Sequence, residues 1–250
     1  DPKDLHVVDQ QHDIEFFYLR PRDIATYVGS GSLDVGFTGL DLLLDSRSKA
    51  VSLADLSFGE STFRFAGPVG KFKSLQDLAG LRVATAYPNL VEDFLKREGV
   101  QVELVQLDGA VEVAVRLGVA DAVADVVSTG NTLRQAGLEI FGPVILQSSA
   151  HLIVAPGKKT DHEQLLRRMQ GVLVAREYVI FDYDCPSALI EAASAITPGI
   201  ESPTISPLRD TDWVAVRSLV KANEINSKMD ELYALGARAI LVSAIHAARI

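Results

Sequence analysis

One arrangement of residues occurs twice in this chain and limits the folds open to it. In each copy a short amphipathic helix ends near a glycine, a strand follows, and a Thr-Gly turn opens another helix. The two copies read "RPRDIATYVGSGSLDVGFTGLDLLLDS" and "GAVEVAVRLGVADAVADVVSTGNTLRQAG". Helices that alternate with strands in this way are typical of α/β domains whose sheets are mostly parallel. The repeat therefore predicts two similar α/β lobes, and Asp41 is placed to cap the helix after the first turn.

The segments around the repeat agree with this class. "LHVVD" and "IEFFYLR" predict a hairpin, and residues 82–86, 90–98 and 102–106 predict a strand, a helix stopped by Gly99, and a second strand. Two lobes with ligand-binding turns at their strand ends predict a cleft between them. We expect a two-lobed body of the periplasmic-binding-protein type. One lobe comprises residues 1–61 and 151–177, and the other comprises residues 62–150.

The last part of the chain, residues 178–250, has a different pattern. Its order is strand, helix, two strands, helix and strand, which is the ferredoxin-like arrangement. The prolines in "SPTISP" favour an edge strand there, because proline cannot donate to a sheet ladder. A small module of this kind after a two-lobed body is often a ligand sensor or an oligomerisation unit.

Composition excludes several classes of function. The net charge of −9 and the pI near 5.0 argue against binding to nucleic acid or to an anionic membrane surface. The single cysteine, Cys185, cannot form an intrachain disulfide, and the five histidines show no metal-ligand spacing. No apolar run reaches the length of a membrane span and no signal peptide is visible, so we expect a cytoplasmic protein. The chain begins at Asp1, and we expect that an N-terminal portion precedes it.

The hydroxyl-rich stretch Ser128–Thr132, "STGNT", follows a predicted strand and precedes a predicted helix. Backbone N–H groups in a glycine-containing turn at a helix start can converge on a phosphate, and the hydroxyls add donors. Asp125, at the end of the strand, is suited to accept hydrogen bonds from sugar hydroxyls. Alternatively, the loop is a polar connector in which Thr or Asn caps the next helix. The pentapeptide by itself leaves both interpretations open.

The wider sequence adds a resemblance. The run from Glu112, "EVAVRLGVADAVADVVSTGNTL", resembles the signature of the ATP phosphoribosyltransferases at every constrained position. "RPRDIATYVGSGSLDVGFTGLDLL", "ATAYPNLV", "ESPTISPL", "WVAVRSLV" and "LGARAILVSAIHAARI" are similar to the long, histidine-regulated form of that family. The resemblance covers essentially the whole chain. Members begin with a strand and a Lys-Gly turn that help hold the nucleotide, and this chain lacks both.

The resemblance implies a reaction. The 5-phosphoribosyl group of phosphoribosyl pyrophosphate (PRPP) is transferred to N1 of the adenine of ATP, pyrophosphate leaves, and Mg²⁺ is required. This is the first step of histidine biosynthesis. The resemblance also implies a homo-oligomer, from dimer to hexamer, and competition by AMP at the nucleotide site. Histidine is expected to inhibit from the C-terminal, ACT-like module.

The resemblance also implies roles for individual residues. Glu112 and Asp125 are the expected catalytic acids and the expected metal ligands, although Glu112 is alternatively a solvated helix carboxylate. The expected PRPP-binding residues are Asp125, Val126, Val127, Ser128, Thr129, Gly130, Asn131 and Thr132.

The expected ATP-binding residues are Arg20, Arg22, Asp41, Tyr87, Asp108 and Gly109. Three of them have simpler alternatives. Arg20 suits a salt bridge to Asp23, Asp41 suits an N-cap, and Tyr87 suits a buried position beside Pro88. The expected histidine-binding residues are Asp184, Ile200, Thr204, Leu219 and Ala239, and Asp184 is alternatively a cap for the helix that starts at Pro186.

Two other functions compete with this one. Without the signature, paired lobes equally permit a small-anion binding protein of the solute-receptor type with a sensor module. A purine-salvage phosphoribosyltransferase is a third possibility. Such enzymes usually carry two adjacent acids before the loop, whereas Asp125 has no acidic neighbour.

Overall fold

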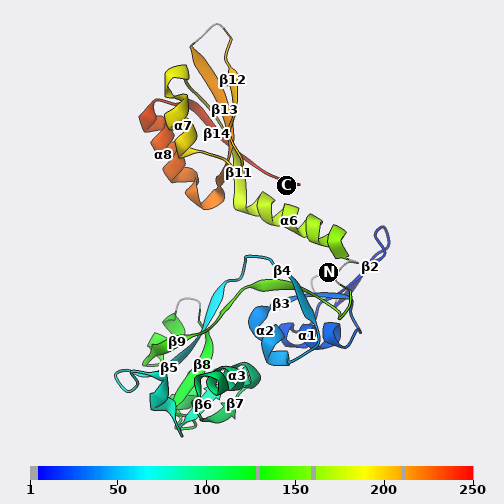
Figure 1. Cartoon of the computed structure of the whole chain (residues 1–250), viewed down its shortest axis with the longest axis vertical. Helices are drawn as coiled ribbons and strands as arrows, with labels where there is room; N and C mark the ends of the chain where they lie inside the picture. Colours follow the sequence, from blue (N-terminus) through cyan, green and yellow to red (C-terminus); the bar gives the residue numbers. More distant parts are fainter. Residues whose placement is uncertain (1–4, 128–129, 159–161, 210–211, 250) are drawn as a thin grey trace. The chain divides into compact units, whose positions relative to one another are not determined.

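The structure is a computed structural model that describes residues 5–127, 130–158, 162–209 and 212–249 (Figure 1). The chain forms two compact units, Asp1–Asp161 and His162–Ile250. We call them the N-terminal unit and the C-terminal unit and describe each by itself. Among the described residues, no helix is both long enough and apolar enough to cross a membrane.

The first lobe of the N-terminal unit is built on a three-stranded sheet in the order β3-β10-β4. Its elements, with the N-terminal hairpin, are β1 (His6–Asp9), β2 (Ile14–Phe17), α1 (Pro21–Gly29), β3 (Val35–Gly39), α2 (Leu40–Ser46), β4 (Val51–Asp55) and β10 (Ala150–Val154). Helices α1 and α2 bury apolar residues such as Val28 and Leu43 against Ile153 of the central strand. The expected hairpin is confirmed, because β1 pairs with β2 in antiparallel register.

The second lobe is built on a five-stranded sheet in the order β7-β6-β8-β5-β9. Its elements are β5 (Ser61–Pro68), η1 (Leu75–Leu78), β6 (Arg82–Thr85), α3 (Pro88–Glu98), β7 (Glu103–Gln106), α4 (Val113–Arg116), β8 (Ala122–Val127), α5 (Asn131–Gln135) and β9 (Leu138–Ser148). One face of the sheet packs Phe63 and Phe65 against the apolar side of α3. The other face packs Val123 against the segments that carry Ala114 and Leu133.

The two-lobed α/β body is confirmed, but the expectation of mostly parallel sheets is wrong. In the first lobe, β10 runs antiparallel to both of its neighbours. In the second lobe, β6 pairs in parallel with β7 and β8, whereas β5 pairs in antiparallel with β8 and β9. The reason is that the chain passes between the lobes twice, once from β4 to β5 and once from β9 to β10. The strand that returns to the first lobe, β10, therefore lies between β3 and β4 and runs antiparallel to both.

Helix ends in the N-terminal unit follow the sequence closely, with one correction. Helix α3 ends at Gly99, whose φ of 70° suits glycine at a helix C-cap. Asp41, however, is not the N-cap of α2, because that position is Gly39 and the helix has no side-chain cap. The carboxylate of Asp41 instead accepts a hydrogen bond from Ser148 Oγ at 2.8 Å. The carboxylate of Asp41 is therefore bound by the end of β9 and does not cap its own helix.

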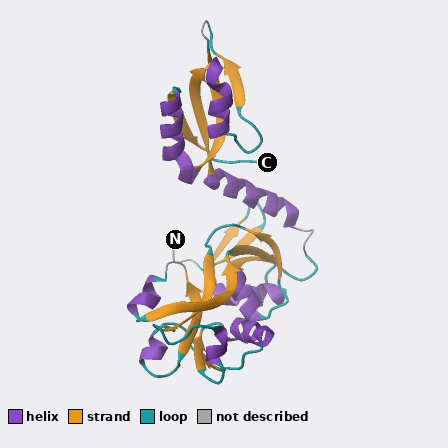
Figure 2. Ribbon diagram, turned by 60° about the vertical axis from the view of Figure 1, so that its left-hand side comes forward, coloured by secondary structure: helices purple, strands orange, loops and turns teal. Residues whose placement is uncertain are grey.

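The C-terminal unit confirms the ferredoxin-like arrangement (Figure 2). Its elements are α6 (Glu163–Glu177), β11 (Tyr178–Pro186), η3 (Ser187–Leu189), α7 (Ile190–Ile196), β12 (Thr204–Pro207), β13 (Trp213–Lys221), η4 (Ala222–Glu224), α8 (Ile225–Leu235) and β14 (Arg238–Ala244). The sheet order is β12-β13-β11-β14 and all its pairs are antiparallel. β12 lies at an edge, as its prolines indicate. Helices α7 and α8 pack on the face that carries Phe181 and Tyr183.

Helix α6 belongs to the C-terminal unit. The sequence-based boundary at 177/178 assigned it to the first lobe. A side chain at Gly171 of this helix would lie 2.2 Å from the carbonyl oxygen of Ala248, so helix and C-terminal segment are in close contact. Contacts of α6 with β11, with η4 and with the C-terminal segment account for this grouping.

Candidate active site

A cavity of about 480 Å³ lies where the chain passes between the two lobes of the N-terminal unit. Its lining is mostly polar and consists of Asp55, Glu60, Ser61, Thr62, Val127, Gln147, Ser148 and Ser149. Val127 ends β8 and lines this cavity, and the expected phosphate loop follows it in the sequence. The arrangement has the expected character of a cleft between lobes.

The phosphate loop is described only in part. Ser128 and Thr129 lie outside the described residues. Gly130 is the N-cap of α5 with a φ of 70°, and Asn131 and Thr132 form the first turn of that helix. Because the described N-cap is a glycine, neither Asn131 nor Thr132 acts as the side-chain cap. The guanidinium of Arg134 contacts the Asn131 side-chain oxygen, a nearby cation that the sequence pattern did not single out.

Asp125 is the acid with the most unusual surroundings. It lies on β8, directly opposite Arg64 of β5, and it is partly buried. Burial raises the pKa of Asp125, and the carboxylates of Glu112 and Asp41 raise it further, although the Val126 N–H opposes them. That N–H donates to Asp125 Oδ1 at 2.8 Å. Two further predicted acids, Glu112 and Asp41, thus come from other segments close enough to repel the charge of Asp125.

Tyr87 lies beside the same acids. Its pKa is raised, first by burial and then by the charge of Asp41 and a hydrogen bond to it, with a smaller contribution from Asp125. The ring meets the ring of Phe63 edge to face, with centroids 5.0 Å apart. Tyr87 therefore keeps its proton over the physiological range and directs an O–H donor toward the carboxylate of Asp41.

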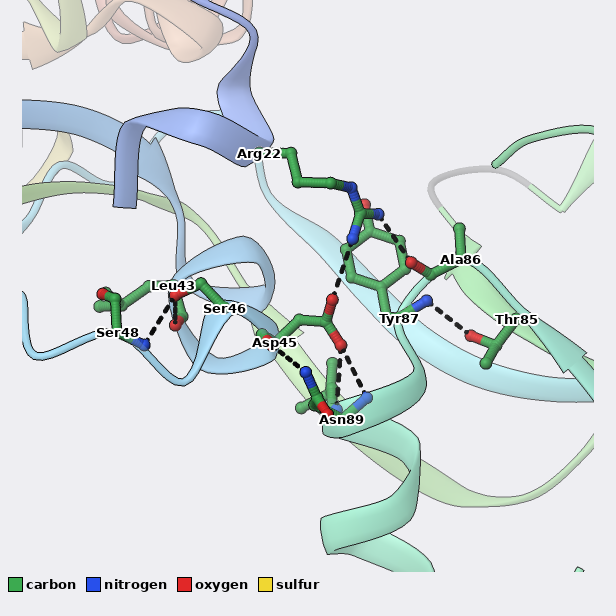
Figure 3. A network of polar contacts seen from close by, with 10 residues as sticks. Arg22, Leu43, Asp45, Ser46, Ser48, Thr85, Ala86, Tyr87 and Asn89 are labelled. Carbon is green, nitrogen blue, oxygen red and sulfur yellow. Dashed lines mark hydrogen bonds and ion pairs between the residues drawn. The ribbon is translucent and has the colours of Figure 1, made fainter. Parts of the chain in front are cut away.

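Arg22 reaches the same tyrosine from the first lobe (Figure 3). Its guanidinium carbon lies 5.0 Å from the centroid of the Tyr87 ring, and its Nη2 donates to the Ala86 carbonyl at 2.7 Å. Its Nη1 donates to Asp45 Oδ2 at 3.0 Å. Asp45 was not among the expected site residues. Beside this network lies a second cavity of about 300 Å³, lined by Arg22, Asp23, Thr26, Asp45, Ser46, Pro88, Asn89 and Gln106.

Three further residues expected to bind ATP are less tied into the structure. Arg20 is exposed and is the N-cap residue of α1, and no Arg20–Asp23 ion pair forms between these two described side chains. Asp108 and Gly109 are exposed in the loop between β7 and α4. The structure brings Arg22, Asp41, Tyr87, Glu112 and Asp125 together and leaves these three at the surface.

The expected histidine-binding residues lie in the C-terminal unit. Asp184 and Leu219 are on the sheet face opposite to α7 and α8, since the buried Tyr183 and Val220 alternate with them. Asp184 does not cap a helix, because neither η3 nor α7 has a side-chain cap. Thr204 pairs with Arg217 on the edge strand. Ala239 sits at the bulge of β14 with a φ of 51°.

Comparison with known proteins decides the family. The family model described as "HisG: ATP phosphoribosyltransferase" matches residues 20–171, and "HisG, C-terminal domain" matches residues 175–247. The chain belongs to the ATP phosphoribosyltransferase family. The C-terminal match identifies the long form. This family catalyses the first step of histidine biosynthesis, so the chain is a transferase and not a solute-binding protein, as the signature around Asp125 indicated.

Individual ATP phosphoribosyltransferases agree with this assignment. The ATP phosphoribosyltransferase of Paenarthrobacter aurescens is 60% identical over 100% of this chain and 90% of its own length. That of Streptomyces avermitilis is 56% identical over 99% of this chain and 89% of its own. A solved ATP phosphoribosyl transferase (HisG:HisZ) complex from Thermotoga maritima has 30% identity and a TM-score of 0.58, and it covers 64% of this chain and 80% of that one. The roles of single residues stay predictions.

Proposed function

We propose that the phosphoribosyl transfer takes place at the interlobe cavity, with PRPP on the second lobe and ATP against Arg22, Asp41 and Tyr87. The observation that supports this most is the surroundings of Asp125: the charges of Glu112 and Asp41 both raise its pKa, and Asp41 in turn accepts a hydrogen bond from Ser148, which lines the cavity. A carboxyl group whose pKa is raised by burial and by nearby carboxylates is typical of a functional site. Gly130 and the start of α5 then hold the 5-phosphate through main-chain N–H groups.

Beyond binding and orienting the two substrates, the reaction requires few catalytic side chains. Breaking the bond at the anomeric carbon builds positive charge on the ribose, as in glycoside hydrolysis. Asp125 accepts hydrogen bonds from the ribose hydroxyls, and its negative charge with that of Glu112 stabilises the cationic sugar. Tyr87 and Arg22 orient the adenine so that its N1 faces the anomeric carbon. Such alignment supplies much of the rate of a two-substrate reaction.

The donor set fits Mg²⁺ carried mainly by the substrate. Mg²⁺ usually keeps several waters and takes one or two carboxylates together with substrate phosphates. Among the described residues, no three His, Cys, Asp or Glu side chains form a cluster able to hold a metal by themselves. Asp125 and Glu112 would therefore hold the ion together with pyrophosphate. When bound, the ion neutralises the leaving pyrophosphate.

Regulation and assembly belong to the same proposal. Histidine would bind the C-terminal unit through Asp184, Thr204 and the backbone at Ala239, with Leu219 and Ile200 as apolar walls. AMP would compete at the nucleotide site, the chain would assemble into dimers or hexamers, and its location would be cytoplasmic. Feedback of this kind corresponds to a coupling free energy of about 1–3 kcal/mol between two sites.

The reaction is tested by mixing the protein with PRPP, Mg²⁺ and ATP. Phosphoribosyl-ATP should form, whereas free adenine in place of ATP should give no product.

The regulatory site is tested with histidine. Added histidine should lower the rate, and Asp184→Ala should relieve that inhibition while sparing the basal rate. A rate that stays constant at high histidine would remove the C-terminal unit as an inhibitory site.

The PRPP site is tested with a pair of glycines. Gly130 and Gly137 flank α5 with φ values of 70° and 75°, so alanine strains the backbone similarly at both, by about 1–2 kcal/mol. Gly130→Ala disturbs the phosphate loop and should weaken PRPP binding about tenfold in calorimetry, whereas Gly137→Ala should leave it nearly unchanged. Equal losses in the two variants would show that helix strain, and not the loop, controls binding.

A further inference from the structure

Asp45 is a buried charge whose partners come from two lobes. It lies near the end of α2 in the first lobe and is only 4% exposed. Its Oδ1 accepts hydrogen bonds from the backbone N–H groups of Asn89 and Leu90, at 3.0 and 3.1 Å. Both donors belong to the first turn of α3 in the second lobe, where unpaired N–H groups and the helix dipole favour a negative charge. One oxygen of Asp45 therefore fixes the start of that helix.

The second oxygen has a different task. Asp45 Oδ2 accepts the Nη1 hydrogen bond of Arg22 at 3.0 Å, and Asn89 Nδ2 donates to the Asp45 carbonyl at 2.8 Å (Figure 3). The Arg22 side chain is 47% exposed, so this pair adds little to stability by itself. It does fix the direction of the guanidinium, which lies over the Tyr87 ring.

Both branches of the network end at Tyr87. This residue is the N-cap position of α3, and Thr85 Oγ1 accepts its backbone N–H at 3.0 Å. The helix start that Asp45 fixes is thus directly continuous with Tyr87, and the guanidinium that Asp45 orients covers the ring. The Tyr87 hydroxyl is the group that meets Asp41 near Asp125.

We propose that Asp45 is a positioning residue for the transfer reaction. It contacts no substrate itself and acts through Arg22 and the turn before α3. The arginine branch alone would fix only the Tyr87 ring, and the helix branch alone would fix only its backbone. The inference rests on the proposed function, since it requires that Arg22 and Tyr87 meet the nucleotide.

The decisive variant is Asp45→Asn. The amide oxygen can still accept from the Asn89 and Leu90 N–H groups, whereas the amide nitrogen then faces the Arg22 Nη1 donor. The hydrogen bonds at the helix start are then kept and only the arginine branch is lost. We expect KM for ATP to rise about tenfold while KM for PRPP changes less than about twofold, because misplacement of an orienting group affects one substrate.

Two controls separate positioning from stability. Asp77 also accepts two backbone N–H bonds, from Lys73 and Ser74, at a helix start, but all these residues lie in the second lobe. Asp77→Asn should leave both KM values unchanged. In the double variant Asp45→Asn with Arg22→Gln, KM for ATP should match that of Arg22→Gln alone within about twofold, because residues of one network are not additive.

The outcomes are distinct. Additive effects in the double variant, or kinetics of Asp45→Asn equal to those of Asp77→Asn, would overturn the inference. If Arg22→Gln and Tyr87→Phe have wild-type kinetics, the proposed nucleotide site itself is wrong. Should Asp45→Asn not fold, Asp45→Glu replaces it: the longer side chain keeps the charge but moves its carboxylate away from the position that orients Arg22, and the same selective rise in KM for ATP is expected.

Discussion

Two carboxylates of the N-terminal unit, Asp45 and Asp125, differ in their surroundings more than in their burial. Asp45 receives two backbone N–H donors and a guanidinium. Asp125 accepts from the N–H of its own neighbour, Val126, and has the like charges of Glu112 and Asp41 around it. The first charge is compensated within the protein. The second charge lies among like charges, so we predict that a cation or a hydrogen-bond donor from outside the protein meets it.

This contrast leads to different predicted roles: Asp45 positions neighbouring groups, whereas Asp125 meets the substrate or the metal. Burying a carboxylate costs free energy unless hydrogen bonds and opposite charges offset it. The arrangement around Asp45 offsets that cost and connects two lobes. The arrangement around Asp125 offsets only part of the free-energy cost of burial. Such an uncompensated carboxylate is typical of sites where substrate or metal supplies the missing partner.

The largest effect should come from Asp125→Asn. The amide keeps the shape but loses the charge that faces the ribose, so kcat/KM should fall by about 100-fold or more. Steady-state kinetics with PRPP and ATP measure this. Asp121→Asn is the control, because Asp121 lies just before the same strand but pairs with Arg82. An Asp125→Asn enzyme of near-normal activity would remove the contrast between the two acids.

The next effect concerns stability and falls on Asp45. Asp45→Ala leaves two N–H groups at the start of α3 and one guanidinium without their acceptor. Loss of a helix cap and of buried acceptors should lower the free energy of unfolding by about 2 kcal/mol. Urea denaturation measures it. The same substitution at Asp77, whose bonds are exposed, should cost less, and equal losses would mean that the interlobe position of Asp45 has no energetic consequence.

The two acids also differ in how far sequence could predict them. Asp125 lies in the stretch that resembles the family signature, so a role for it could be predicted from a short local stretch of sequence. Nothing in "LDLLLDS" distinguishes Asp45, because the N–H groups it binds lie 44 and 45 residues further along the chain. A local pattern cannot indicate a partner that only the packing of two lobes brings near.

The same limit applies to the fold. Gly99 marks a helix end through its left-handed conformation, a local property, and that end was predicted. The direction of β10 was not, since that strand comes from beyond the second lobe and pairs between β3 and β4. Asp41 was expected to cap its own helix, but its carboxylate instead accepts a hydrogen bond from Ser148, which lies 107 residues away in the sequence.

A smaller effect is expected in the pH dependence of stability. A carboxyl whose pKa is raised on folding binds more protons when folded, so stability falls as pH rises from the ordinary value of 3.8 through the raised value. Wild type should therefore lose stability relative to Asp125→Asn over that interval, and the difference should stay constant above it. Urea titrations between pH 4 and pH 7 measure the difference. A constant offset at every pH would show that folding does not raise the pKa of Asp125.

The smallest effect concerns an exposed connection between the lobes. Arg47 donates to Glu92 and Asp93, both at 2.7 Å, but all three side chains are about half exposed or more. Its φ of 49° is left-handed, a conformation that favours glycine at a helix C-cap. Arg47→Gly should therefore leave Tm unchanged or raise it by about 2 °C, whereas Arg47→Ala, which keeps the strain, should lower it slightly. If both variants lowered Tm as much as Asp45→Ala does, exposed and buried interlobe charges would be equivalent, and the importance of burial at Asp45 would be lost.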